Sequence, residues 1–287
     1  MAAFEHRVFW LAAVCCMAGF PSINAHEGLS TDAAIIAVQN IQDGFDLIVP
    51  DVKKTDAFRL RVGVGFGSIP DYIGSSSYRR KVMPLIDIRY GKRWRLSNRQ
   101  LRYAAFLSGE WKIGPFIKQK SGRREARSPA LAGLGNIKNT AQIGLFAKYR
   151  SDTMLFNAEF RHALGARQGG SVRVTVGHGL FKSGDFAAAI AISSKWLSKT
   201  AMQTNFGISH EQSLNSDALY REFEPASGIS DGSISLFTRY KIGRRTRLVG
   251  LASYGRLLGA AADSPLVVAD TGSADQFKVG IGFTFDF

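Results

Sequence analysis

Histidines and cysteines are the residues in this sequence best suited to acid–base or metal chemistry. Cys15 and Cys16 lie inside an N-terminal apolar run, so a chain cleaved behind that run keeps no thiol. The histidines beyond it are His26, His162, His178 and His210. No two of these have the close spacing of a zinc site. The sequence therefore predicts no metal centre and no cofactor.

A hydrolase would need a histidine next to a serine and a carboxylate. His162 and His178 fall on the apolar phase near the ends of predicted strands, where anchoring at an interface is the simpler role. His210 opens a predicted loop and is the remaining candidate. The segments 63–67 and 280–282 resemble nucleotide-binding loops, but neither opens a helix. We therefore expect no catalytic residue and no enzyme activity.

The elements that must position any site are β-strands, because apolar and polar residues alternate along most of the chain. The clearest case is 277–287, which is about the length that crosses a bilayer when tilted. One face carries Phe277, Val279, Ile281, Phe283, Phe285 and Phe287, and the other carries Lys278, Gly280, Gly282, Thr284 and Asp286. We expect Phe283, Phe285 and Phe287 to form the signal that the barrel-assembly machinery recognises.

The same alternation predicts about twelve strands, at 57–67, 80–90, 92–107, 111–120, 139–149, 153–163, 170–180, 185–196, 201–209, 232–243, 246–257 and 274–287. A soluble sandwich is the alternative, but its core would not accept full charges in mid-strand, whereas a solvated lumen does. The basic residues assigned to the lumen are Arg59, Arg61, Arg89, Lys112, Lys118, Lys148 and Arg173. The predicted fold is all-β, a single transmembrane antiparallel β-barrel of the bacterial outer-membrane type.

An even strand count leaves both ends of the barrel chain in the periplasm. The external loops are then 68–79, 210–231 and 258–273, and the inner turns include 197–200 and 244–245. The basic segment 121–138 becomes an unexpectedly long periplasmic loop, unless the count is off by one strand. Pro84 and Pro115 predict bulges or strand ends. Aromatic residues near strand ends predict a membrane girdle: Tyr90, Trp94, Trp111, Tyr149 and Tyr240.

Residues 1–25 have the pattern of a cleaved secretory signal, with Arg7 before an apolar run and Ala25 at the cleavage site. We predict a periplasmic N-terminal segment, or an insert in the lumen, at 26–56 and a barrel at 57–287, in the outer membrane of a Gram-negative bacterium. Lys and Arg outnumber Asp and Glu by 14. In an exported chain this balance favours lipopolysaccharide phosphates over nucleic acid, with 79–81 as a contact.

Four short segments share a further pattern. Pro70, Asp71, Tyr72, Gly74 and Ser75 form a Pro-Asp-Tyr-x-Gly-Ser element, and 131–136 contains Gly-Leu-Gly. Asn-Phe-Gly-Ile-Ser follows at 205–209, and Ala262, Asp263, Ser264 and Pro265 follow Leu-Leu-Gly at 257–259. Together, in this order, they resemble the MipA/OmpV family of outer-membrane proteins. Ala260 stands where that family often has an acid.

The resemblance implies an outer-membrane barrel without catalysis of its own. The founding member of the family is regarded as a scaffold that joins a murein transglycosylase to a penicillin-binding protein, so these are the implied partners. In this interpretation 121–138 and 26–56 supply the contact. The alternatives are a passive channel with a basic, anion-favouring lumen and a surface adhesin that acts through 210–231 and 258–273.

Overall fold

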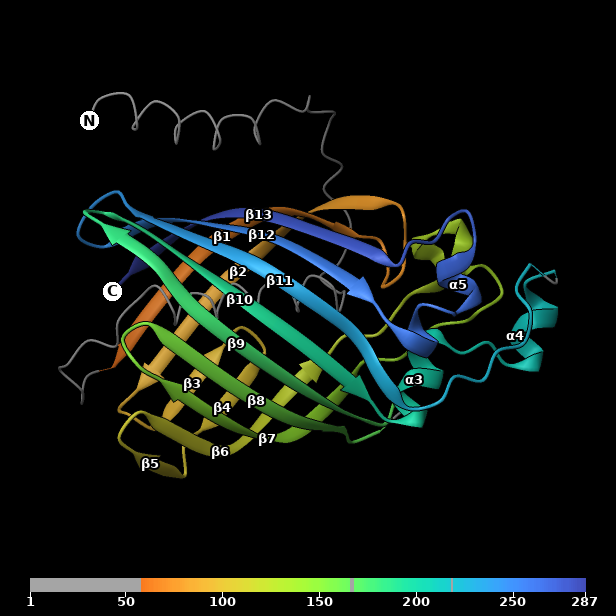
Figure 1. Cartoon of the computed structure of the whole chain (residues 1–287), viewed down its shortest axis with the longest axis horizontal. Helices are drawn as coiled ribbons and strands as arrows, with labels where there is room; N and C mark the ends of the chain where they lie inside the picture. The colour runs from red at the N-terminus through yellow and green to blue at the C-terminus, as the bar shows by residue number, and fades with distance from the viewer. Residues whose placement is uncertain (1–57, 166–167, 218) are drawn as a thin grey trace.

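Antiparallel strands wind round a closed barrel in the computed structural model, which describes residues 58–165, 168–217 and 219–287 (Figure 1). The predicted signal peptide at 1–25, the predicted segment at 26–56 and His26 lie outside the described residues. Apart from β4 and β5, which both pair with β6, each strand pairs with its neighbours in sequence, and the first strand pairs with the last. The predicted all-β barrel is confirmed.

The strands are β1 (Arg59–Pro70), β2 (Tyr78–Tyr90), β3 (Trp94–Ser97), β4 (Gln100–Tyr103), β5 (Phe106–Ser108), β6 (Trp111–Lys120), β7 (Thr140–Arg150), β8 (Met154–Ala163), β9 (Gly170–Ser183), β10 (Phe186–Leu197), β11 (Gly228–Lys241), β12 (Thr246–Leu257) and β13 (Asp275–Asp286). Both β4 and β5 pair with β6, so they are two pieces of one strand broken at 104–105. The described barrel therefore has twelve strands, as the sequence predicts.

The outer face of the barrel is apolar. On β13 the exposed side chains are Phe277, Val279, Ile281, Phe283 and Phe285, and the polar residues between them face inward or are small. Other strands repeat the arrangement, with Val64 and Phe66 exposed on β1. An apolar exterior with a polar interior is stable in a bilayer, where the lipid covers the exterior.

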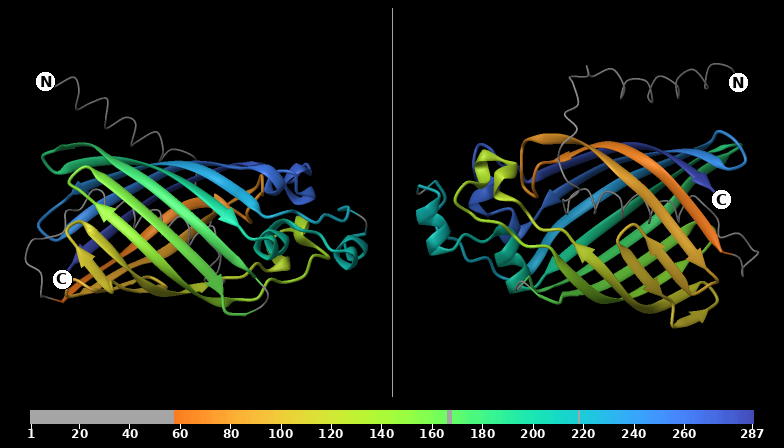
Figure 2. Two further views of the ribbon diagram at one scale, coloured as in Figure 1. Left: turned by 60° about the horizontal axis from the view of Figure 1, so that its bottom comes forward. Right: turned by 180° about the vertical axis from the view of Figure 1, so that it is seen from behind.

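The helices of the described chain are short and lie in the connections: η1 (Glu125–Arg127), η2 (Pro129–Leu131), α3 (Lys199–Phe206), α4 (His210–Asn215), η3 (Gly259–Ala261) and α5 (Pro265–Val268). Within the described residues, none of them has the length and apolar character needed to cross a membrane. They gather at one end of the barrel, opposite the end where Phe287 lies (Figures 1 and 2). We call these the loop end and the turn end.

The first error of sequence reasoning is at 92–107, which is not one strand. The chain reverses between Ser97 and Gln100, and β3 pairs with β4 as a hairpin. Asn98 adopts a φ of 46°, which asparagine tolerates in two-residue hairpin turns. Its side-chain Oδ1 accepts a hydrogen bond from the Ile86 backbone N–H at 2.8 Å, which fixes the turn against β2.

The second error is at 201–209, which is helix α3 followed by a loop. Ser198 caps the helix, since its Oγ accepts a hydrogen bond from the Ala201 backbone N–H at 3.3 Å. The buried face of α3 consists of Ala201, Met202 and Phe206, which follows the helical period. The alternation of small and large residues there imitates a strand.

The first error leaves out one strand and the second adds one, so the total of twelve is unchanged. Every strand between 111 and 196, however, runs in the direction opposite to the predicted one. The segment 121–138 therefore lies at the loop end, together with the connections at 71–77, 198–227 and 258–274. Its expected place among the periplasmic turns is wrong, and 197–200 is likewise the start of a loop-end connection rather than a turn. In the described part of the chain, the connections at the turn end are short, at 91–93, 109–110, 151–153, 184–185 and 242–245.

The predicted aromatic girdle lies at the turn end of the barrel. Its five residues stand at the turn-end termini of β2, β3, β6, β7 and β11, and four of them are exposed. The rings of Trp111 and Tyr149 pack 5.2 Å apart across β6 and β7. Pro84 occupies neither a bulge nor a strand end, whereas Pro115 lies opposite a one-residue register shift in the partner strand, which agrees with the predicted bulge. Pro84 lies on the part of β2 that β3 does not reach, and Pro115 lies opposite the break between β4 and β5. Proline has no backbone N–H to donate, and each of these positions lacks a paired strand residue on one side.

Candidate functional site

The three histidines of the described residues lie at separate places on the surface. His162 and His178 are exposed on the outer face of β8 and β9, as expected from their phase. His210 is exposed at the start of α4, with its Nδ1 3.5 Å from Glu222 Oε2. Over the described residues, no three His, Cys, Asp or Glu side chains come together as a metal site would require. The chemistry of the molecule lies instead in the barrel interior and in the loops at the loop end.

The basic residues predicted for the lumen lie on the strand face opposite the exposed apolar side chains. Arg61, Lys118, Lys148 and Arg173 are buried. Arg59, Arg89 and Lys112 are partly buried. The carboxylates that meet these cations stand on the same polar phase of the strands, but the sequence did not predict which cation each carboxylate pairs with.

The best-enclosed carboxylate is Glu159 on β8. It accepts hydrogen bonds from Arg102 and Arg161, with the Arg161 Nε at 2.9 Å, and from Asn157 Nδ2 at 3.3 Å. The Arg102 guanidinium also lies 5.3 Å from the centre of the Phe146 ring. A buried carboxylate between two arginines is stable because every charge has a close counter-charge.

Two further carboxylates repeat this arrangement. Asp87 on β2 binds Arg89 at 3.0 Å and Arg95 at 2.8 Å. Asp286 on β13 binds Arg61 at 2.5 Å and also contacts Arg247. Because Arg61 belongs to β1, this last set joins the strands that close the barrel. The pairs of Asp87 with Arg95 and of Asp286 with Arg61 therefore link neighbouring strands on the inner face of the barrel.

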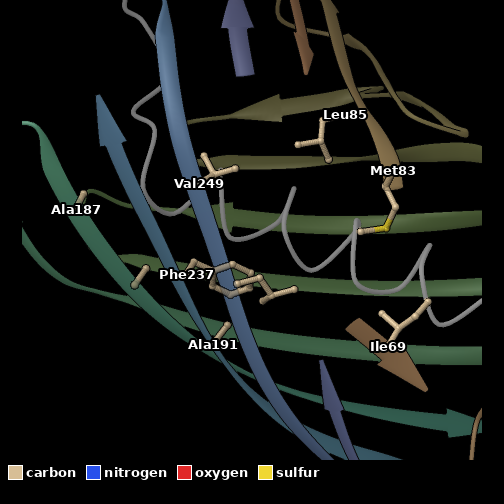
Figure 3. Close-up of a cluster of buried hydrophobic side chains, with 9 residues drawn as sticks. Ile69, Met83, Leu85, Ala187, Ala191, Phe237 and Val249 are labelled. Carbon is tan, nitrogen blue, oxygen red and sulfur yellow. The ribbon is translucent and has the colours of Figure 1, made fainter. Parts of the chain in front are cut away.

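A second sector of the interior is apolar, which the sequence analysis did not anticipate. Figure 3 shows Ile69, Met83, Leu85, Phe237 and Val249 among the side chains directed into the barrel. The rest of this cluster is Ala187, Ala189, Ala191 and Leu251. They come from β1, β2, β10, β11 and β12, on inward positions that a purely polar lumen would fill with hydrophilic residues.

The loop end carries a packed cap, which we define as the connections 71–77, 121–139, 198–227 and 258–274. One buried cluster takes a residue from every one of them: Tyr72, Ala130, Leu131, Leu134, Ile208, Tyr220 and Leu266. A second cluster fixes the cap to the barrel wall through Leu197, Ala201, Met202, Phe206, Leu257, Ala261 and Val267. Segments far apart in sequence thus share one small core, and Figure 2 shows the helices of these connections at the same end of the barrel.

Hydrogen bonds between the connections hold the cap in one arrangement. The Tyr220 hydroxyl donates to the Ala130 carbonyl at 2.9 Å, and Gln212 Nε2 donates to the Leu134 carbonyl at 2.6 Å. The Ser264 hydroxyl donates to the Phe206 carbonyl at 2.6 Å. These bonds are shared between loops, so no loop of the cap is positioned by its own sequence alone.

The family-motif residues meet in this cap. Pro70, Tyr72, Gly74 and Ser75 are buried, and Asp71 is partly buried. Ser264 and Pro265 are buried, Ala262 is partly buried and Asp263 is exposed. Gly74 has a φ of 97°, and a Cβ placed there would stand 2.7 Å from Val267 Cγ2. Glycine is therefore required where 71–77 crosses 258–274.

Two polar side chains of the cap, Tyr72 and Arg123, are shielded from solvent. Burial raises the pKa of the Tyr72 hydroxyl, and Arg123 and a hydrogen bond to Thr271 oppose that shift. Burial lowers the pKa of the Arg123 guanidinium to about 10, against the opposing charges of Tyr72 and Glu125. Near neutral pH the tyrosine is uncharged and the arginine charged, so Arg123 is a partly enclosed cation of the cap.

A closed antiparallel barrel with an apolar exterior, aromatic rings at its turn end and ion pairs inside is an outer-membrane β-barrel. A family model described as MltA-interacting protein MipA matches residues 62–287, and the chain belongs to this family. The resemblance seen in the sequence is confirmed.

Solved structures with similar folds are distant in sequence. A NanC porin is 11% identical with a TM-score of 0.42, covering 79% of this chain and 98% of that one. The COG4313 outer-membrane channel from Pseudomonas putida F1 is 11% identical with a TM-score of 0.40, covering 83% and 100%. The translocator domain of NalP from Neisseria meningitidis is 9% identical with a TM-score of 0.44, covering 89% and 95%. No curated protein sequence matches the chain.

Proposed function

We propose that the chain is a non-enzymatic interaction protein of the Gram-negative outer membrane that binds a murein transglycosylase from its turn end. The family description, MltA-interacting protein, supports this partner class. The observation that carries the proposal is the turn end, where short connections expose Lys92, Arg244 and Arg245, whereas the long connections pack into the cap at the other end. The proposal includes three further partners: a penicillin-binding protein, lipopolysaccharide at the outer surface and the barrel-assembly machinery.

The direction of the barrel decides which surface meets the enzyme. Barrels of this class have short periplasmic turns and longer external loops. By that rule the turn end faces the periplasm, where murein enzymes act, and the cap faces outward. The contact that the sequence analysis assigned to 121–138 therefore moves to the turn end, where Lys92, Arg244 and Arg245 are exposed, and to the segment 26–56.

A pull-down of a murein transglycosylase tests this assignment. The triple charge reversal Lys92→Glu, Arg244→Glu and Arg245→Glu should lower recovery of the enzyme at least tenfold, because it alters only the turn end. The matched control is Arg221→Glu, an exposed reversal in the cap. Heat-modifiable gel mobility verifies that both variants fold. Loss of binding in the cap variant with full binding in the turn-end variant would overturn the proposal.

The second candidate is a passive, anion-favouring channel, and the buried cations of the interior support it. Planar-bilayer recording of the refolded protein separates the candidates. Anion-selective steps that fall in the variant Lys148→Glu favour the channel, and silence under the same conditions favours the interaction protein. Adhesion through 210–231 and 258–273 would use the outer surface of the cap.

A further inference from the structure

The apolar sector of the barrel interior is buried more completely than the barrel wall explains. Its nine side chains are at most 5% exposed, and they include Ala187, Ala189 and Ala191 on β10 (Figure 3). Wall side chains just fill an eight-stranded barrel, and the diameter of a barrel grows with its number of strands. Twelve strands enclose a wider interior, in which an alanine extends only a short way from the wall. The strands alone therefore do not account for this burial.

A buried arginine beside this sector lacks a hydrogen-bond partner at two of its nitrogen atoms. Arg239 follows Phe237 by two positions on β11, so both side chains point to the inner face, where Figure 3 shows Phe237. Arg239 is 2% exposed, yet its Nε and Nη2 donate to no acceptor of the described chain. Arg61 and Arg247 repel its charge, and Asp185 attracts it from the exposed turn between β9 and β10. A buried charge without a close partner is costly, so an acid that reached Arg239 would stabilise the interior.

The stretch 33–49, which lies outside the described residues, has the composition that this part of the interior requires. It has apolar runs at 33–38 and 47–49, and its only charged residues are Asp43 and Asp46. The whole chain, in contrast, has a net charge of +14. Apolar residues next to an acid complement an apolar surface next to a buried cation, both in hydrophobicity and in charge. The stretch is therefore a suitable cover for the apolar sector.

We propose that 33–49 enters the barrel from the turn end and packs against the apolar sector, with one of its two acids bound to Arg239. Strand β1 begins at the turn end with Arg59, and Arg239 lies two residues from the turn-end terminus of β11. The linking residues 50–56 can extend over about 20 Å, so they allow this arrangement. They stay at the turn end, within reach of the transglycosylase contact proposed above. The stretch is then an internal plug of the barrel, and this role does not depend on that contact.

Disulfide formation in the full mature chain tests this packing. The predicted mature chain has no cysteine, so pairs of cysteines can be introduced without a background thiol. Ala191→Cys places one on the inner wall, and Ile192→Cys places the control on the outer face, where Ile192 is 62% exposed. Each is combined with Ile36→Cys, Ile41→Cys or Leu47→Cys, oxidised in detergent and digested for mass spectrometry. We expect at least one of the three to cross-link to position 191 at least tenfold more than to position 192. Equal yields, or no cross-link to position 191, would overturn the proposal.

The ion pair is tested by the rate at which a water-soluble maleimide labels Ala191→Cys in the full mature chain. Loss of the pair should uncover the inner wall, so Arg239→Met should raise the rate at least fivefold. Asp43→Asn with Asp46→Asn should do the same, and all three changes together should raise it no further, because they remove one interaction. Asp51→Asn, outside the stretch, should leave the rate unchanged. Heat-modifiable gel mobility verifies that each barrel folds. An unchanged rate in Arg239→Met, or effects that add, would contradict the plug.

Discussion

The cap and the charged interior belong to one barrel but are stabilised by opposite kinds of interaction. In the cap, buried apolar residues such as Leu131 and Leu266 from different connections share a core. In the interior, Glu159 is enclosed by Arg102 and Arg161. Apolar burial is non-directional and tolerates small changes of shape, whereas a buried ion pair depends on every partner being present.

The comparison shows which part of the sequence specifies which part of the molecule. Strands place the charged residues, because each alternate position points inward and pairing fixes the neighbours. The cap needs contacts between 71–77, 121–139, 198–227 and 258–274, none of which has the regular period of a strand. The interior should therefore respond sharply to the loss of one charge, and the cap more gradually to the loss of volume.

The largest effect is expected from Glu159→Gln. The change is nearly isosteric but leaves Arg102 and Arg161 facing a neutral amide in a buried position. We expect a loss of about 4 kcal/mol in the free energy of unfolding. Urea unfolding of the barrel in lipid vesicles measures it. Glu110→Gln, in an exposed turn, should change the stability by less than about 0.5 kcal/mol. A loss below about 1 kcal/mol for Glu159→Gln would mean that water reaches the pair.

A smaller and more local effect is expected from Leu131→Ala. Leu131 is 0% exposed at the centre of the cap, and truncation should cost about 3 kcal/mol. The barrel wall does not depend on this residue, so cap opening should precede barrel unfolding. Limited proteolysis should cut within 121–139 and 198–227 while heat-modifiable mobility persists. Leu214→Ala, which removes a leucine that is 64% exposed in the same cap, is the control.

The strands could be predicted from sequence because their signal is local. The strand at 111–120 has the predicted bounds, and most others agree within a few residues. The direction of the middle strands could not be predicted, because it depended on one turn at Asn98 and one capped helix after Ser198. Both signals were present, as an asparagine in a two-residue turn and a serine before a helix, but each was embedded in an alternating pattern.

The candidate site was predictable only in part, for a related physical reason. Basic residues on the polar phase of a strand can be recognised directly from the alternation, and four of the seven predicted lumen residues are buried. Which carboxylate meets which cation depends on the register between strands, as for Arg61 and Asp286, which are 225 positions apart. The apolar cluster around Phe237 was missed because its residues occupy inward positions that were taken for a solvated lumen.

The smallest effect is expected from Tyr220→Phe. The change removes only the hydroxyl that donates to the Ala130 carbonyl across the cap, so it should cost about 1 kcal/mol. Tyr254→Phe also removes a hydroxyl, one that donates to Asp275 at an exposed position, and serves as the control. Unfolding of the cap, followed by proteolysis of 198–227, measures both.

Combining these variants tests whether the two regions are independent. Tyr220 and Leu131 lie in one cluster, so the double variant should depart from additivity by about 0.5 kcal/mol or more. Tyr220→Phe with Glu159→Gln should be additive, because their interactions share no residue. Coupling of the second pair would show that the cap transmits strain into the charged interior, and the two regions would then be one cooperative unit rather than two.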